Sequence, residues 1–133
     1  MKRKHKARAA YFKDVLYDLY KLFKKYDAAI EFRWVDGVCY AAFFLDEAFT
    51  RHHITMGSYD VLDQQSMRSM LQYLPESQKK LRKFMRAFID FCEEHNLHVT
   101  RSGVIYINGV WITSVLQLSP YYLYYEWQHF DVA

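Results

Sequence analysis

The sequence predicts an α+β domain in which long amphipathic helices pack on antiparallel sheet. Apolar residues recur with helical spacing over residues 8–26 and again in the segment that follows Pro75. Each of these stretches is followed by short alternating segments with glycine-containing two-residue turns. A helix followed by a hairpin or meander therefore occurs twice, in residues 8–45 and 77–116, which indicates two pseudo-symmetric halves. No stretch resembles a linker, so residues 1–133 are expected to form one domain.

The first helix is predicted from Arg8 to Tyr26, because its apolar residues follow the i, i+3, i+4, i+7 spacing of one helical face. Residues 1–7 are expected to form a basic, flexible arm ahead of it. A second arc of this helix lies opposite the apolar face and consists of Lys13, Tyr17, Tyr20, Lys21 and Lys24. Its lysines would neutralise phosphates and its tyrosines would stack on unpaired bases, or the arc is only a solvated helix face.

The next segment, AIEFRWVDGVCYAAFF, predicts a β-hairpin around the turn signal Asp36-Gly37. Pairing Val35 with Val38 fixes the register, and the face that carries the remaining apolar pairs is expected to lie in the core. These pairs are Trp34–Cys39, Phe32–Ala41 and Ile30–Phe43. The residues that follow fit either a third short strand near His52–Met56 or an irregular loop.

The stretch DVLDQQSMRSMLQYL predicts a modest helix, and Pro75 begins a second one well, since proline is favoured in a first turn. The apolar stripe of this second helix is the cleanest in the chain and consists of Leu81, Phe84, Met85, Phe88 and Cys92. Its cations crowd the first half and its acids the end, against the preference of the helix dipole. The exposed cations are expected to face a partner's carboxylates or phosphates, or only solvent; they are Lys79, Arg82, Lys83 and Arg86.

The last third of the chain predicts a three-stranded meander with tight turns at Ser102-Gly103 and Asn108-Gly109. Ser119 as N-cap and Pro120 as first helical residue then predict a short C-terminal helix. One stripe of that helix is expected to pack on the sheet or on a neighbouring subunit: Leu123, Tyr124, Trp127 and Phe130. The other side is a candidate interface with a protein partner or a second copy of the chain: Tyr121, Tyr122 and Tyr125.

Composition excludes a disordered chain, because hydrophobic residues make up 52% and aromatic residues 19%. No signal peptide or membrane span is apparent, and Cys39 and Cys92 fall on apolar stripes, so buried free thiols and a cytoplasmic location are expected. The net charge of +3 hides an asymmetry. Six of the 18 Lys and Arg residues lie before position 14, which leaves −3 for residues 14–133.

Two copies of a His-apolar-Thr motif stand at His53-Ile54-Thr55 and His98-Val99-Thr100. This pairing resembles the two-histidine phosphoesterases, in which two such motifs on facing strands of a pseudo-symmetric α+β fold act on phosphodiesters. The resemblance implies that His53 and His98 are the acid and base, since imidazoles titrate near neutral pH. It also implies that Thr55 and Thr100 bind the phosphate of an oligonucleotide or cyclic nucleotide.

Cys92, His95 and His98 are residue types that bind zinc, but their spacing matches no strong zinc signature, so no metal or cofactor is predicted. The preferred interpretation is a small non-enzymatic binding protein that engages nucleic acid or an acidic protein surface through its basic N-terminal region. Four residues would steer the encounter: Lys2, Arg3, Lys4 and Lys6. An inhibitor of a host factor, encoded by a phage or mobile element, is one such role, although no motif points to it. The phosphodiesterase is the alternative.

Overall fold

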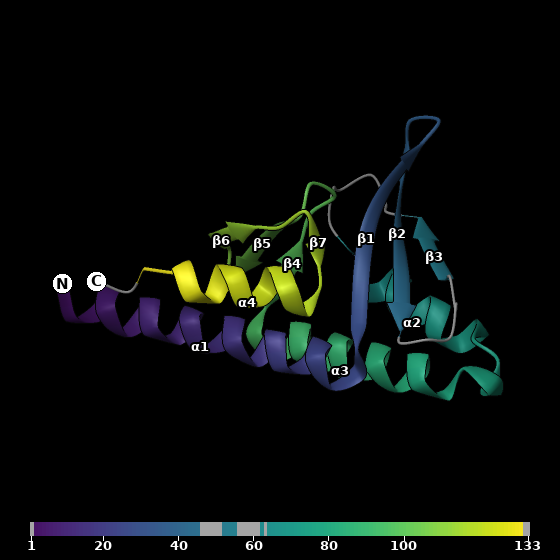
Figure 1. Cartoon of the computed structure of the whole chain (residues 1–133), viewed down its shortest axis with the longest axis horizontal. Coiled ribbons are helices and arrows are strands. Elements are labelled where there is room, and N and C mark those ends of the chain that lie inside the picture. The colour runs from purple at the N-terminus through teal and green to yellow at the C-terminus, as the bar shows by residue number, and fades with distance from the viewer. Residues whose placement is uncertain (1, 46–51, 56–61, 63, 132–133) are drawn as a thin grey trace.

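The computed structural model describes residues 2–45, 52–55, 62 and 64–131. The elements are, in chain order, α1 (Lys2–Tyr26), β1 (Ala28–Val35), β2 (Val38–Leu45), β3 (His52–Thr55), α2 (Gln64–Tyr73), the 3-10 helix η1 (Glu76–Gln78), α3 (Lys79–His95), β4 (Leu97–Val99), β5 (Val104–Ile107), β6 (Val110–Ser114), β7 (Gln117–Leu118) and α4 (Pro120–His129). The long helices α1 and α3 form a layer beneath the strands, and α4 lies along α1 (Figure 1). The predicted α+β class is confirmed.

The strands form two antiparallel sheets, one with the order β3-β2-β1-β7 and one with the order β4-β5-β6. β7 pairs with β1, opposing Leu118 to Ile30, so the segment before α4 joins the sheet built by the first half of the chain. A helix followed by antiparallel strands occurs twice, as predicted: α1-β1-β2 and α3-β4-β5-β6. Of the two alternatives for the segment near His52–Met56, the strand is the one that forms, as β3.

α1 begins at Lys2, so residues 2–7 belong to the helix and do not form the separate arm that the sequence suggested. Neither glycine nor proline interrupts the segment, and Lys, Arg and Ala are strong helix formers, so nothing ends the helix at Arg8. The side chains of Lys2, Arg3, Lys4 and Lys6 lie outside the described part of the structure. Further along, the predicted apolar face is buried, with Leu16, Leu19 and Phe23 fully inaccessible.

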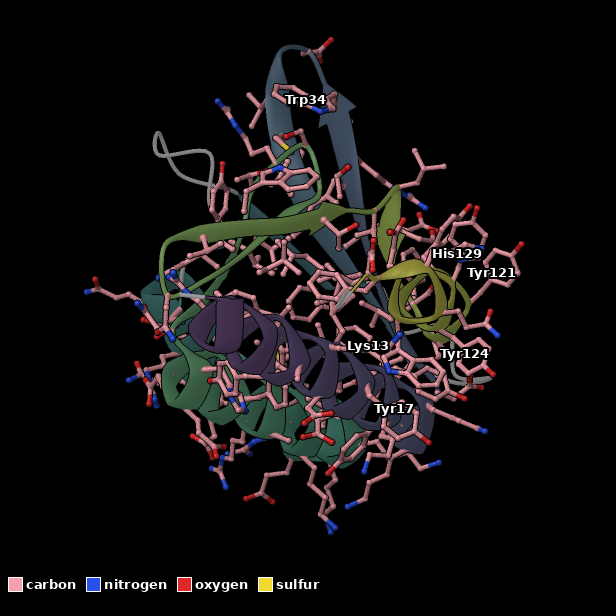
Figure 2. All side chains as sticks on the ribbon, turned by 90° about the vertical axis from the view of Figure 1, so that its left-hand side faces the viewer. Lys13, Tyr17, Trp34, Tyr121, Tyr124 and His129 are labelled. Carbon is pink, nitrogen blue, oxygen red and sulfur yellow. The ribbon has the colours of Figure 1, made fainter. Side chains whose placement is uncertain are left out.

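The β1–β2 hairpin has the predicted register, with Val35 opposite Val38 and Ile30 opposite Phe43. Asp36 and Gly37 both have positive φ angles, 50° and 77°, as a type I′ turn requires. The expectation that Trp34 lies in the core is wrong, because its side chain is 58% exposed. The hairpin projects beyond the helices and the second sheet, so its tip has no layer to cover it (Figures 1 and 2).

α3 supplies the largest part of the core, and its whole predicted stripe is buried. Phe23 of α1 meets Phe84 and Phe88 edge-on, with ring centroids 5.1 and 5.5 Å apart, which joins the two helices. Cys39 and Cys92 are buried free thiols, as predicted. Burial raises the pKa of both, because it disfavours the charged thiolate.

The β4–β5 turn needs glycine at Gly103 for two reasons. Its φ angle is +84°, and a Cβ atom there would lie 1.9 Å from the carbonyl oxygen of Val115. The Val115 N–H donates to the Gly103 carbonyl (2.9 Å), so this turn is hydrogen-bonded to the segment after β6. Among the described residues, no helix combines the length and apolarity that a bilayer crossing demands.

Candidate ligand-binding surface between α1 and α4

Aromatic side chains fill the line of contact between α1 and α4, which run antiparallel (Figure 1). The rings of Tyr17 and Trp127 lie 4.8 Å apart, and those of Tyr20 and Tyr124 lie 5.1 Å apart. A second contact between Tyr124 and Trp127, at 5.4 Å, links the two pairs. The face of α1 that the sequence assigned to solvent is therefore partly covered by α4.

Lys13 lies on this covered face and points toward α4 (Figure 2). Its ammonium donates to the carbonyl of Phe130 (3.2 Å), the residue that ends α4, and it lies 5.4 Å from the ring centre of Trp127. A cation at the carbonyl end of a helix interacts favourably with the helix dipole. Lys13, which was predicted to contact a partner, is thus engaged within the fold.

The other two lysines of the predicted arc are exposed beside the same rings. Lys21 lies 5.2 Å from the ring centre of Tyr17 and forms an ion pair with Asp18 (3.3 Å). Lys24 lies 5.6 Å from the ring centre of Tyr20. A hydrogen bond to the Tyr20 hydroxyl raises the pKa of Lys24, so the ammonium form is favoured.

An open groove of about 540 Å³ lies where α1 ends beside the start of α4. This volume falls within the usual range of small-molecule sites. Tyr121 is 73% exposed and Tyr125 50% exposed, so their rings offer apolar faces to a ligand. The lining side chains that matter for recognition are Tyr20, Lys24, Asp27, Tyr121, Tyr124 and Tyr125.

The predicted division of α4 into an inner and an outer side is partly wrong. Leu123 is fully buried, and Trp127 and Phe130 pack against the core, as predicted. Tyr122 also packs against the core, whereas Tyr124 is 39% exposed. α4 packs along α1 through Tyr124 and Trp127, and this contact leaves Tyr124 partly exposed at the edge of the interface.

The charge of the chain is divided more unevenly between α1 and the remaining residues than between residues 1–13 and residues 14–133. Nine of the 18 Lys and Arg residues and two of the 15 Asp and Glu residues lie in α1, so this helix carries +7 and the rest of the chain −4. The tyrosine-lined groove lies at the end of this helix, where Lys24 lines it, whereas six of the nine cations precede position 14. A field of this kind attracts polyanions at low ionic strength.

The predicted cationic face of α3 is exposed at Lys79, Lys83 and Arg86, while Arg82 is half-buried. α3 runs antiparallel to α1, and the hydrogen bond between the Tyr11 hydroxyl and Nδ1 of His95 (2.9 Å) fixes the end of α3 beside the start of α1. At the acidic end of α3, Glu93 forms an ion pair with Arg68 of α2. A cation from another helix therefore partners one of the acids at that end.

The two histidine motifs lie on different sheets. His53 is on β3, an edge strand of the four-stranded sheet, and its side chain and that of Thr55 lie outside the described part of the structure. His98 is on β4, an edge strand of the other sheet, and its Nε2 is 3.0 Å from Oδ1 of Asn96. The Thr100 hydroxyl accepts a hydrogen bond from the Val104 N–H (3.1 Å) in the adjoining turn. Acid–base roles for the two histidines stay a prediction.

The candidate zinc ligands do not converge. Cys92 faces the core, His95 contacts Tyr11, and His98 contacts Asn96. Across residues 2–45, 52–55, 62 and 64–131, no group of three or more His, Cys, Asp or Glu side chains is placed to hold a metal ion.

The sequence predicted half of the residues that line the groove as candidate binding residues, but not the groove itself. It placed Tyr20 and Lys24 on one exposed arc and Tyr121 and Tyr125 on another, without a reason to bring these arcs together. The tyrosine surplus on both helices was the available signal. Comparison of the chain with protein-family models, curated proteins and solved structures finds no match.

Proposed function

We propose that the chain is a non-enzymatic binding protein whose α1–α4 surface takes single-stranded nucleic acid. The observation that carries the proposal is an open groove lined by four tyrosines and by Lys24, at the end of a helix that carries +7 along its length. Proteins that bind single strands combine aromatic rings, on which bases stack, with cations that follow the phosphates. Both components meet in this groove.

The roles divide between the two helices. Tyr121 and Tyr125 of α4 present the exposed rings on which unpaired bases stack. Lys24 of α1, which is exposed beside the Tyr20 ring, and the neighbouring Lys21 neutralise phosphates. A duplex keeps its base faces stacked inside, so the rings favour a single strand.

The test is a titration of a fluorescein-labelled 12-nucleotide oligo(dT) followed by fluorescence anisotropy at 50–300 mM salt. Tyr121→Ala is expected to weaken binding by about 1–3 kcal/mol, the usual contribution of one stacked base, with little change in salt dependence. Lys24→Ala is expected to weaken binding and to lower the slope of log K against log salt by about 0.7, as expected for one phosphate contact on a single strand.

Lys83→Ala on α3 is the matched control, because it removes one exposed cation that does not line the groove. It is expected to leave the affinity within twofold of the unmodified protein. No binding at 50 mM salt would refute the proposal. An equal loss of affinity for Lys83→Ala and Lys24→Ala would show only general attraction between a basic protein and a polyanion. An acidic peptide that competes as well as the oligonucleotide would lead to the same conclusion.

A further inference from the structure

A second hollow, of about 260 Å³, lies on the opposite side of the ridge that Tyr121 and Tyr125 form. Its wall is completed by the segment that follows β6, including Leu116, whose side chain is 80% exposed. The volume is below the usual range for a whole small-molecule ligand. It is of the size that accepts one long side chain of a partner.

The lining of this hollow combines aromatic rings with one carboxylate. The rings belong to Tyr121, Tyr122 and Tyr125, and the first two meet at 5.2 Å in an edge-to-face arrangement. Glu126 supplies the carboxylate, and its Oε2 accepts a hydrogen bond from the buried Thr113 hydroxyl (2.7 Å). This bond holds the carboxylate at a fixed place beside the rings.

The charge of the second hollow is opposite to that of the groove. Lys24 lines the groove, whereas no lysine or arginine is among the described residues that line the hollow. A hollow with π faces and a carboxylate, but no cation, attracts a positive group and repels a phosphate.

We propose that this hollow binds the arginine side chain of a protein partner. A guanidinium stacks flat on tyrosine rings and pairs with a carboxylate through directed hydrogen bonds, which a lysine ammonium does less well. The methylene stem of the arginine would lie on Leu116, whose apolar side chain is mostly exposed at the wall of the hollow. This function goes beyond nucleic-acid binding and needs a different ligand, although both sites share Tyr121 and Tyr125.

The probe is an acetylated and amidated peptide with one arginine between glycines, compared with its citrulline counterpart, which keeps the shape but not the charge. Binding is followed by ¹H–¹⁵N NMR on the whole chain. The largest shifts are expected at Leu116 and in the first turns of α4, and the citrulline peptide is expected to bind at least fivefold more weakly. Equal binding of the two peptides, or shifts centred elsewhere, would overturn the proposal.

Two variants test the residues. Glu126→Gln keeps an oxygen for the Thr113 hydroxyl and is expected to weaken arginine binding about five- to tenfold, as loss of a charged hydrogen-bond partner does. Leu116→Lys changes a side chain that the fold does not use and is expected to abolish binding by repulsion without altering the melting temperature. Unchanged affinity in either folded variant contradicts the proposal. Glu94→Gln, which removes one exposed carboxylate on α3, is the matched control and is expected to bind normally.

The two proposals fail separately. Glu126→Gln is expected to bind oligo(dT) as the unmodified protein does, and Lys24→Ala is expected to bind the arginine peptide normally. A chain that binds the peptide but no oligonucleotide retains the arginine site and loses the proposed function. A peptide in which lysine replaces arginine is expected to bind at least threefold more weakly, and equal binding would remove the assignment to arginine.

Discussion

α1 and α3 look alike in sequence and differ in what lies beside them. Each is a long helix, they share the Phe23–Phe84–Phe88 core, and each exposes a row of cations. α4 packs along α1, so that Lys13 of α1 lies over the Trp127 ring of α4. Lys24 lies over the Tyr20 ring, which itself contacts Tyr124 of α4. The difference teaches that a cationic face becomes a selective site through its neighbour, because charge alone attracts any polyanion.

The largest effect is expected from breaking what the two helices have in common. Phe88→Ala removes a fully buried ring that contacts Phe23 and Phe84, and large-to-small changes of this kind cost about 3–5 kcal/mol of unfolding free energy. Urea denaturation measures the loss. Phe91→Ala, a half-buried phenylalanine on the same helix, is the control and is expected to cost about 1 kcal/mol. Similar losses for the two variants would show that the shared core does not join the helices as described.

A smaller and more selective effect is expected from separating α1 from α4. Trp127→Ala removes the half-buried ring that contacts Tyr17, Tyr124 and the Lys13 ammonium, at a cost of about 2 kcal/mol, less than for a fully buried tryptophan. Because the ring positions α4, oligonucleotide affinity is expected to fall with it. Trp111→Ala, at a 57% exposed position on β6, is the matched control and should change unfolding free energy by less than about 0.5 kcal/mol.

The effect of Trp127→Ala is expected to stay on the α1 side of the molecule. Amide hydrogen exchange should accelerate in α4 and leave the α3 amides protected. Acceleration spread equally over both helices would mean that α4 is part of one cooperative unit with α3. The contrast between α1 and α3 would then hold for the surfaces of these helices and not for their stability.

The features that the sequence predicted well are those that one element determines by itself. The hairpin register follows from alternation around Asp36-Gly37, and the α3 stripe follows from its own periodicity. Trp34 was misplaced because periodicity tells which face a side chain is on but not how far the covering layer extends. The start of α1 was misplaced because charge suggests an arm, while helix propensity favours continuation to Lys2.

The candidate surface was only half predictable for the same reason. The exposure of Tyr121 and Tyr125 follows from the position of Ser119-Pro120, which sets the phase of α4. The placement of Tyr122 and Tyr124 depends on the direction from which α4 is packed, and no local pattern encodes that direction. Contacts with residues distant in sequence fix it, among them Tyr20 of α1 against Tyr124 and Thr113 of β6 bonded to Glu126.

The smallest effect is expected at the ammonium that ties the two helices together. Lys13→Met keeps an apolar stem beside Trp127 but removes the hydrogen bond to the Phe130 carbonyl and the charge at the end of α4. Such a bond contributes about 0.5–1.5 kcal/mol, so global stability should change little and the last turn of α4 should fray. Exchange of the amides near His129 is the sensitive measurement, with Lys21→Met as a control that removes a cation from an exposed pair with Asp18. If Lys13→Met leaves exchange in that turn unchanged, Lys13 does not hold the end of α4 and acts only as surface charge. α1 would then offer a polyanion one more cation than the contacts of the Lys13 side chain indicate.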